Sequence, residues 1–408
     1  MSQKHWVIER LGHHGDGVAE GPVFAPITLP GEEVTGRLEG QQLEDVRIIN
    51  PSDARVTPPC RHFRSCGGCS VQHASDEFVR NWRQDIVRVA LANQGIDAEF
   101  IAPHVSPPMT RRRASFSARR TKKSAMAGFH ARASNAIVEI PDCKILHPDL
   151  LAGTDIACEL ARNGGSRKAE LSVSITVTEN GLDVEARGGK PLDGPLRAAL
   201  GDIARRNRIA RLSWEKEVVF QDRPPEQRFG KARVVPPPGA FLQATREGEL
   251  TLIEEVCAHL VGAKRVVDLF AGCGTFTFPL AENAQVHAVE GDSEMVEALK
   301  TAWRNVQGLK TITADSRDLF RDPLEAAELT DFDAVCLDPP RAGAETQVRA
   351  LAKSDLQRIA YVSCSPTSFA RDSRILIDAG FEMSEVKVVD QFRWSAHVEL
   401  VAGFTRNA

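Results

Sequence analysis

Hydrophobic and polar positions along the chain follow three successive patterns. Residues 6 to about 50 contain short apolar runs separated by Gly and Pro turns, which is typical of a small all-β barrel. Apolar side chains then recur at helical spacing over residues 76–94, at Phe78, Trp82, Ile86, Val89 and Ala90. From Arg265 onward, buried strands alternate with glycine turns and helices. The pattern predicts an α/β chain of more than one domain.

Chain length and one proline-rich stretch suggest where the domains divide. A chain of 408 residues fits two or three domains. The run Pro236-Pro237-Pro238-Gly239 separates mixed strands and helices from the doubly wound pattern. We therefore predict a barrel over residues 1–52, a central α+β domain over 53–235 and a Rossmann-like domain over 236–408.

Net charge and cysteine content indicate the cellular compartment of the protein and the partners that it can bind. The net charge of −4 gives no global basic footprint, so a nucleic acid would have to bind local patches. One such patch is residues 111–123, which hold seven basic residues and no acid; a solvated hairpin face is the alternative interpretation. Nine cysteines, an odd number, favour metal or catalytic use in a reducing compartment. With no signal peptide or membrane-length apolar run, we expect a cytoplasmic protein without a membrane partner.

Three cysteines lie together in the sequence Cys60-x5-Cys66-x2-Cys69. Gly67 and Gly68 allow the chain to fold tightly there, which is typical of a metal or cluster loop. Three thiolates need a fourth ligand to hold a metal or cluster, and Cys143, in another turn-like context, is the natural candidate. A zinc site completed by His62 or His73 remains the alternative.

The Rossmann-like half begins with a strand ending at Asp268, followed by Gly272 and Gly274. Glu290 ends the next strand, where an acid can accept hydrogen bonds from ribose hydroxyls, and Asp315 follows the third. A dinucleotide site would need a third glycine to seat a pyrophosphate. S-adenosyl-L-methionine has no phosphate, so this pattern favours it as the cofactor.

Three further chemical groups lie at strand ends in the same half. Asp338 precedes Pro-Pro-Arg341 and is held extended by the proline, while Cys364 ends an apolar run and Glu399 lies at a strand end near the C-terminus. A buried core cysteine and a solvated carboxylate are the alternatives for the last two. Together these residues suit methylation of uracil C5: Cys364 adds to C6, Asp338 and Arg341 contact the base, and Glu399 removes the C5 proton. The target base would have to be flipped out of its stack.

These motifs resemble the RNA 5-methyluridine methyltransferases, and most closely the branch with an N-terminal TRAM domain and an iron–sulfur cluster. The matching segments are Gly15–Gly17, Leu29–Glu32, Cys60, Cys66, Cys69, Cys143, Asp268–Gly274, Asp338–Arg341, Ser363-Cys364 and His397–Glu399. The resemblance implies a [4Fe-4S] cluster on the four cysteines, Cys364 as nucleophile and Glu399 as general base. It also implies a set of residues around S-adenosyl-L-methionine and the substrate pocket: Gln243, Phe270, Thr275, Glu290, Asp315 and Asp338.

The sequence departs from this family at two places. Gln391-Phe-Arg-Trp-Ser395 replaces the usual Phe-Pro-x-Thr, and Thr275 stands where several relatives carry Asn. A TRAM module with a cluster resembles the enzymes that modify large-subunit ribosomal RNA, so we expect 23S ribosomal RNA rather than transfer RNA as the partner of a monomeric enzyme. A transfer-RNA enzyme, an RNA cytosine-C5 methyltransferase and a non-catalytic RNA-binding protein are the alternatives.

Overall fold

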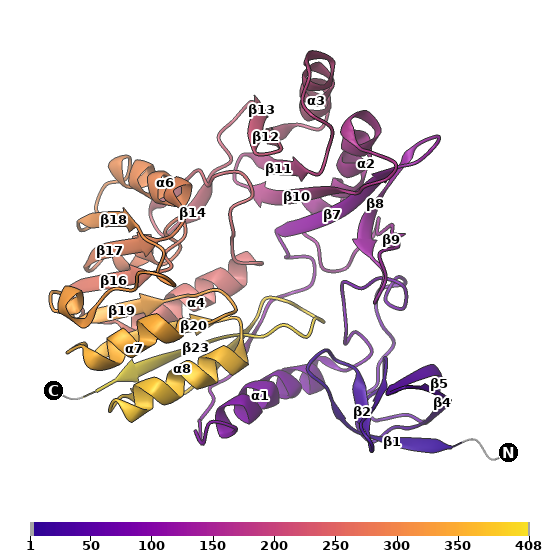
Figure 1. Ribbon diagram of the computed structural model, residues 1–408, viewed down its shortest axis with the longest axis horizontal. Helices are drawn as coiled ribbons and strands as arrows, with labels where there is room; N and C mark the ends of the chain where they lie inside the picture. The colour runs from indigo at the N-terminus through magenta and orange to yellow at the C-terminus, as the bar shows by residue number, and fades with distance from the viewer. Residues whose placement is uncertain (1–3, 407–408) are drawn as a thin grey trace.

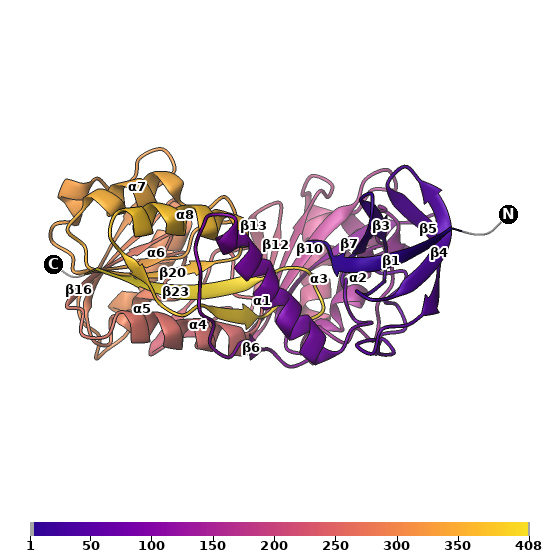
Figure 2. The same cartoon turned by 90° about the horizontal axis from the view of Figure 1, so that it is seen from below.

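The computed structural model describes residues 4–406. Figures 1 and 2 show an elongated molecule, with a small barrel at one end and a helix-covered sheet at the other. A second sheet and helix α1 (Asp76–Ala92) lie between them. Across the described residues, no helix is long and apolar enough to cross a membrane.

The N-terminal strands close into the predicted barrel. Its strands, in the barrel order β1-β2-β3-β5-β4, are β1 (His5–Leu11), β2 (Gly17–Ala19), β3 (Val23–Ala25), β5 (Gln42–Asn50) and β4 (Glu33–Glu39). Ile8, Val34 and Leu43 fill the interior. Gly17 begins β2. A Cβ there would lie 2.1 Å from the Thr28 hydroxyl, so only glycine fits.

The middle of the chain forms a seven-stranded sheet with two α-helices and one short 3₁₀ helix packed against it. In sheet order the strands are β13 (Glu217–Gln221), β12 (Ile209–Trp214), β11 (Gly181–Arg187), β10 (Leu171–Thr178), β7 (Arg113–Arg120), β8 (Ala125–His130) and β9 (Ile137–Val138). The helices are η1 (Pro148–Leu150), α2 (Gly153–Gly164) and α3 (Gly194–Arg206). Phe116, the centre of the basic run, is fully buried in this core because alternate residues of β7 face the helices.

The C-terminal half contains the predicted doubly wound sheet. Its main path is β18 (Ile312–Ser316), β17 (Gln285–Glu290), β16 (Arg265–Leu269), β19 (Ala334–Leu337), β20 (Arg358–Ser363), β23 (Glu399–Thr405), β22 (Lys387–Asp390) and β6 (His104–Val105), with β21 (Glu382–Met383) beside β23. The helices are α4 (Arg246–His259), α5 (Thr277–Leu280), α6 (Ser293–Arg304), η2 (Ala326–Leu329), α7 (Glu345–Lys353) and α8 (Pro366–Asp378), and a hairpin of β14 (Gln227–Phe229) and β15 (Ala232–Val234) precedes them. Strands β18 to β20 are parallel and β23 is antiparallel to β20.

Helix α1 joins the two halves. It begins after Ser75, whose side chain accepts a hydrogen bond from the Phe78 amide, and it packs against α8. Its buried face includes Trp82 and Arg83, whereas Val89, predicted in the core, is 52% exposed. That part of the prediction was wrong because a buried arginine, which the apolar pattern does not detect, shifts the face that packs.

Candidate active site

Cys364 lies at the carboxyl edge of the parallel sheet. Strand β20 ends at Ser363 and α8 begins at Pro366, so the thiol occupies the short turn between them. Ser365 caps the helix by accepting a hydrogen bond from the Ser368 amide. The Cys364 side chain is half-buried. It therefore lies at the edge where ligands bind in open α/β sheets and remains open to solvent on one side.

Two carboxyl groups from neighbouring strands face this thiol. Asp338 follows β19, and Glu399, 3% exposed, begins β23 on the other side of β20. Burial raises the pKa of Glu399 to about 7, although a hydrogen bond from Gln391 and the charge of Arg341 both lower it. Burial, together with the charges of Glu399 and Asp268, holds the pKa of Asp338 well above its usual range. Two acids so perturbed at one edge are typical of proton-transfer chemistry.

The same surroundings make Cys364 a weak acid in the free protein. Burial, followed by the charges of Glu399 and Asp338, raises the pKa of its thiol to about 11, while Arg341 lowers it. The thiolate form becomes accessible when one of the carboxyl groups takes up a proton or when a base lies nearby. Cysteine and carboxyl groups therefore titrate as one interacting set.

Arg341 and His397 form a pair at the mouth of this edge. Arg341 Nη2 lies 2.9 Å from His397 Nδ1, and both residues are exposed. Partial covering of its ring by neighbouring residues and the charge of Arg341 lower the pKa of His397, so its neutral ring can accept a hydrogen bond from the guanidinium. The pair presents a cation to whatever enters the site.

Gln243 and Gln391 close the inner side of the site. Gln243 Nε2 lies 3.4 Å from Asp338 Oδ2, and Gln391 Nε2 donates to Gln243 Oε1 at 2.6 Å and to Glu399 Oε2 at 3.1 Å. Gln243 was predicted from the sequence, whereas Gln391 was not assigned a role. The only signal for Gln391 was its place in a run that departs from the family pattern.

The glycine turn after β16 lies beside this edge. Asp268 accepts a hydrogen bond from the Thr277 hydroxyl at 2.5 Å, and Glu290 accepts from the Gly272 and Asp292 amides at 3.0 and 2.9 Å. The turn requires left-handed backbone at Phe270, φ 61°, and at two glycines that follow. The carboxylate of Glu290 is thereby fixed over the turn, with lone pairs left for a ligand.

The other predicted cofactor residues lie nearby but differ in environment. Thr275 is half-buried within the turn, and the Phe270 ring packs against Phe320 at 5.4 Å between centroids. The Asp315 side chain is 73% exposed, with Oδ2 3.6 Å from His287 Nε2. Among the six, the structure brings Gln243 and Asp338 into direct contact, while Asp315 points to the sheet face that carries His287.

The four cysteines converge on one loop region beside the seven-stranded sheet. Burial, followed by the charges of Cys143, Cys66 and Cys60, raises the pKa of Cys69 to about 12, so the four thiols are close neighbours. The Gly68 amide donates to Cys66 Sγ at 3.4 Å. Within residues 4–406, however, no group of three or more His, Cys, Asp or Glu side chains has the spacing of a metal site.

The two histidines considered as zinc ligands have other partners. His62 Nε2 lies 3.0 Å from Asp142 Oδ1, on the surface. His73 is fully buried, with Nε2 3.3 Å from the Thr28 carbonyl oxygen, and its ring packs on Phe63. The His73 contact links this loop to the barrel, and the His62 contact links it to the loop that carries Cys143.

The basic run divides into a structural and an exposed part. Arg112 is buried and pairs with Glu249, and its Nε donates to the Gln243 carbonyl at 3.1 Å. This residue is therefore unavailable to a phosphate. Arg120, Lys122 and Lys123 are exposed at the tip of the β7–β8 hairpin.

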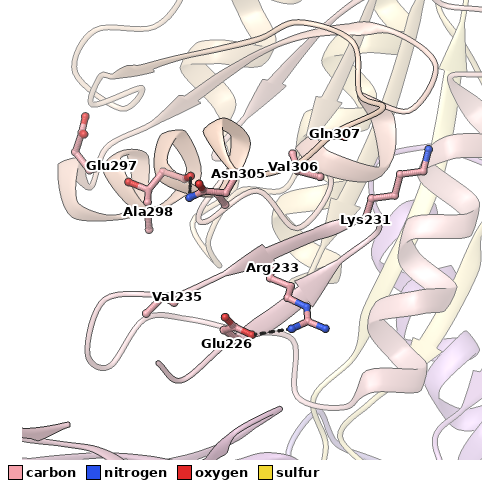
Figure 3. Close-up of a pocket in the computed structure, with 11 residues that line it drawn as sticks. Glu226, Lys231, Arg233, Val235, Glu297, Ala298, Asn305, Val306 and Gln307 are labelled. Carbon is pink, nitrogen blue, oxygen red and sulfur yellow. Dashed lines mark hydrogen bonds and ion pairs between the residues drawn. The ribbon is translucent and has the colours of Figure 1, made fainter. Parts of the chain in front are cut away.

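A cavity of about 870 Å³ lies between the β14–β15 hairpin and α6. Figure 3 shows its lining, in which Glu226 pairs with Arg233 and Lys231 lies at one end. None of the predicted catalytic or cofactor residues lines it. The volume of a cavity alone therefore does not identify the active site of this protein.

The parallel sheet, its glycine turn and the thiol–carboxyl edge define an α/β enzyme whose ligands bind at the carboxyl edge of the sheet. Residues 202–406 match the family model described as tRNA (uracil-5-)-methyltransferase. An RNA methyltransferase of Rhizobium meliloti is 45% identical over 98% of this chain and 99% of its own length. A 23S rRNA (uracil(1939)-C(5))-methyltransferase of Vibrio parahaemolyticus is 30% identical, covering 98% of this chain and 95% of its own.

A solved structure shares the whole fold. The tRNA (uracil-54, C5)-methyltransferase of Pyrococcus abyssi, in complex with S-adenosyl-L-homocysteine, has a TM-score of 0.73 at 20% identity, over 98% of this chain and 100% of that one. The chain therefore belongs to the RNA uracil-C5 methyltransferases, enzymes that use S-adenosyl-L-methionine.

Proposed function

We propose that this enzyme methylates C5 of one uridine in 23S ribosomal RNA through a covalent bond between Cys364 and C6 of the base. The observation that carries the mechanism is the convergence of Cys364, Asp338 and Glu399 at one sheet edge. The 30% identity to a ribosomal RNA enzyme over nearly the whole chain favours that RNA class. We place the enzyme with its substrate in the cytoplasm.

The residues act in a fixed order. Arg341, the cation that lowers the pKa of Cys364, favours the thiolate, which forms a bond to C6 and moves an electron pair to C5. When bound, S-adenosyl-L-methionine supplies the methyl group that C5 acquires. Glu399 then takes the C5 proton, the C5–C6 double bond re-forms, and the bond to Cys364 breaks to release thiolate and 5-methyluridine. Asp338, whose carboxyl group has a raised pKa, contacts the polar edge of the base.

The cofactor is proposed to bind across the glycine turn. Glu290, fixed by two backbone amides, suits the ribose hydroxyls, and Phe270 with Thr275 forms the adjoining wall. Gln243, Asp315 and Asp338 complete the proposed set. The exposure of Asp315 leaves it free to turn toward an adenosine ring when the cofactor is present.

We further propose that the cysteines hold a [4Fe-4S] cluster. The support is their convergence, the burial of Cys66, Cys69 and Cys143, and the amide hydrogen bonds to sulfur, which Cys143 also receives from Ile145 and Leu146. Burial raises the pKa of Cys66, Cys69 and Cys143, so a cationic centre would be needed to stabilise their thiolate forms. Cys60, Cys66, Cys69 and Cys143 would be its ligands.

The domain division is proposed as a TRAM-like barrel over residues 1–52, a cluster and RNA-binding region over 53–235, and the catalytic domain over 236–408. Two features cross these boundaries: β6 joins the catalytic sheet, and α1 packs on α8. We assign the exposed cations of the β7–β8 hairpin to the RNA backbone.

The test is nucleoside mass spectrometry of unmodified ribosomal and transfer RNA after incubation with the protein and labelled S-adenosyl-L-methionine. We expect label in 5-methyluridine from ribosomal RNA, and none with Cys364→Ala. Label in transfer RNA would overturn the RNA class, and label in 5-methylcytidine would overturn the base. RNA binding without label, unchanged by Cys364→Ala, would indicate a binding protein.

A further inference from the structure

Gln391 is a buried glutamine whose side chain connects two elements of the site. It follows β22 directly and is 1% exposed. Its Oε1 accepts from the Ala244 amide at 2.7 Å and the Thr245 amide at 3.4 Å, while its Nε2 donates to Gln243 and Glu399. Both the oxygen and the nitrogen of its side-chain amide therefore have two hydrogen-bond partners.

The orientation of this side-chain amide is determined by the backbone. Amide N–H groups of Ala244 and Thr245 can only donate, so the oxygen of Gln391 must face them. Its NH₂ group therefore faces the site. The oxygen and the NH₂ group of a glutamine can often exchange places, but at Gln391 only one orientation satisfies the two backbone amides.

This arrangement propagates to the next residue. Because Gln391 donates, Gln243 must accept through Oε1, and its own NH₂ group then faces the carboxyl of Asp338. The Gln243 carbonyl is held from the other side by buried Arg112. A line of hydrogen bonds thus runs from the α4 N-terminal segment to both acids of the site.

We propose that Gln391 is a positioning residue: it sets the orientation of Gln243 and holds the Glu399 carboxylate ready to take the C5 proton. The inference rests on the proposed uracil methylation and deepens it. Gln391 is buried behind the acids, so it acts through Gln243 and Glu399 and makes no contact with RNA.

The role has a specific consequence for ionisation. Glu399 is faced by Asp338 from β19, by Cys364 from β20 and by Arg341 from the loop after β19. Of these neighbours Arg341 favours its charged form, and the hydrogen bond from Gln391 does so as well. Without the hydrogen bond from Gln391, only Arg341 opposes the rise in the pKa of Glu399 that burial causes. Glu399 should therefore ionise at a higher pH.

The test compares Gln391→Met with the wild-type enzyme, since methionine keeps the length and removes both donors and acceptor. Turnover is measured as 5-methyluridine formation at saturating cofactor, across pH and RNA concentration. We expect the rising limb of kcat against pH to move up by about one unit, the value of one charge-assisted hydrogen bond. The KM for RNA should stay unchanged, and raising the pH should restore most of the lost rate.

A matched control is Gln347→Met in α7. Gln347 is also buried and exchanges two hydrogen bonds with Leu324, outside the site. It should lower the melting temperature without moving the pH limb. Gln391→Glu should be more damaging than Gln391→Met, because a carboxylate facing Glu399 repels it.

Two outcomes overturn the inference. If Gln391→Met lowers the rate by the same factor at every pH, the residue is only structural and the proposed methylation stands. If the wild-type enzyme forms no 5-methyluridine in any RNA, the proposed function and this inference both fall.

Discussion

Arg83 provides the sharpest test of how the N-terminal half supports the site. This side chain in α1, 1% exposed, pairs with Asp390 and donates to the carbonyls of Phe392 at 3.1 Å and Ser395 at 2.7 Å. One guanidinium thus holds most of the segment between β22 and β23. That segment carries His397 and leads directly to Glu399.

Arg83→Met should destabilise the protein strongly. It leaves the Asp390 carboxylate, 4% exposed, without its cation, and removing one partner of a buried pair costs about 3–5 kcal/mol. Two carbonyls also lose their donor. Against a total stability of about 5–15 kcal/mol, this is a large fraction. The rate of 5-methyluridine formation should fall with it, because the segment loses its attachment.

The assay is urea denaturation followed by tryptophan fluorescence, with Trp82 and Trp394 near the change. Arg88→Met is the matched control: Arg88 lies on the same helix and pairs with Asp85 at an exposed site, worth less than about 1 kcal/mol. Arg83→Met with Asp390→Leu should recover part of the loss, since no charge is then left buried. An Arg83→Met protein as stable as Arg88→Met would refute the reasoning.

Three further predictions follow from the site. Glu399→Gln should accumulate RNA covalently bound to Cys364, visible as a slow band on a denaturing gel, because proton removal contributes about 10²–10⁴-fold to rate; normal product release would exclude Glu399 as the base. In the wild-type enzyme the rate should rise with pH through about 7, because Glu399 must be ionised to accept a proton; a rate independent of pH from 6 to 8 would contradict this. Protein purified without oxygen should contain iron and acid-labile sulfide in equal amounts and lose both in Cys143→Ser, whereas zinc without sulfide would exclude the cluster.

The fold could be predicted largely because its strands are short apolar runs with clear stops. Parallel strand β19 is buried along its whole length and reads as a continuous apolar segment, and β16 does so at Val266 and Val267. The packing face of α1 could not be predicted in this way. Arg83 is buried only because its partner, 307 residues away, accepts its charge, and no local pattern contains that information.

The same limit applies to the site. Cys364, Asp338 and Glu399 could be placed at one edge because each adjoins a strand terminus, which the sequence marks with Ser, Pro or a polar–apolar change. Gln391 could not, since the meaning of an amide depends on its partners, and Gln243 lies 148 residues away. Arg112 was counted with the basic patch for a similar reason: its buried partner, Glu249, is 137 residues distant.

The cysteine loop and the catalytic segment are also in direct contact. The Ser70 and Val71 amides, immediately after Cys69, both donate to the Trp394 carbonyl, at 2.7 and 3.1 Å. The Trp394 ring packs into the same core as Cys66, Cys69 and Cys143, and its backbone is left-handed, with φ 59°. Such a conformation persists only where its surroundings hold it. The cysteine loop therefore positions the segment that leads to Glu399.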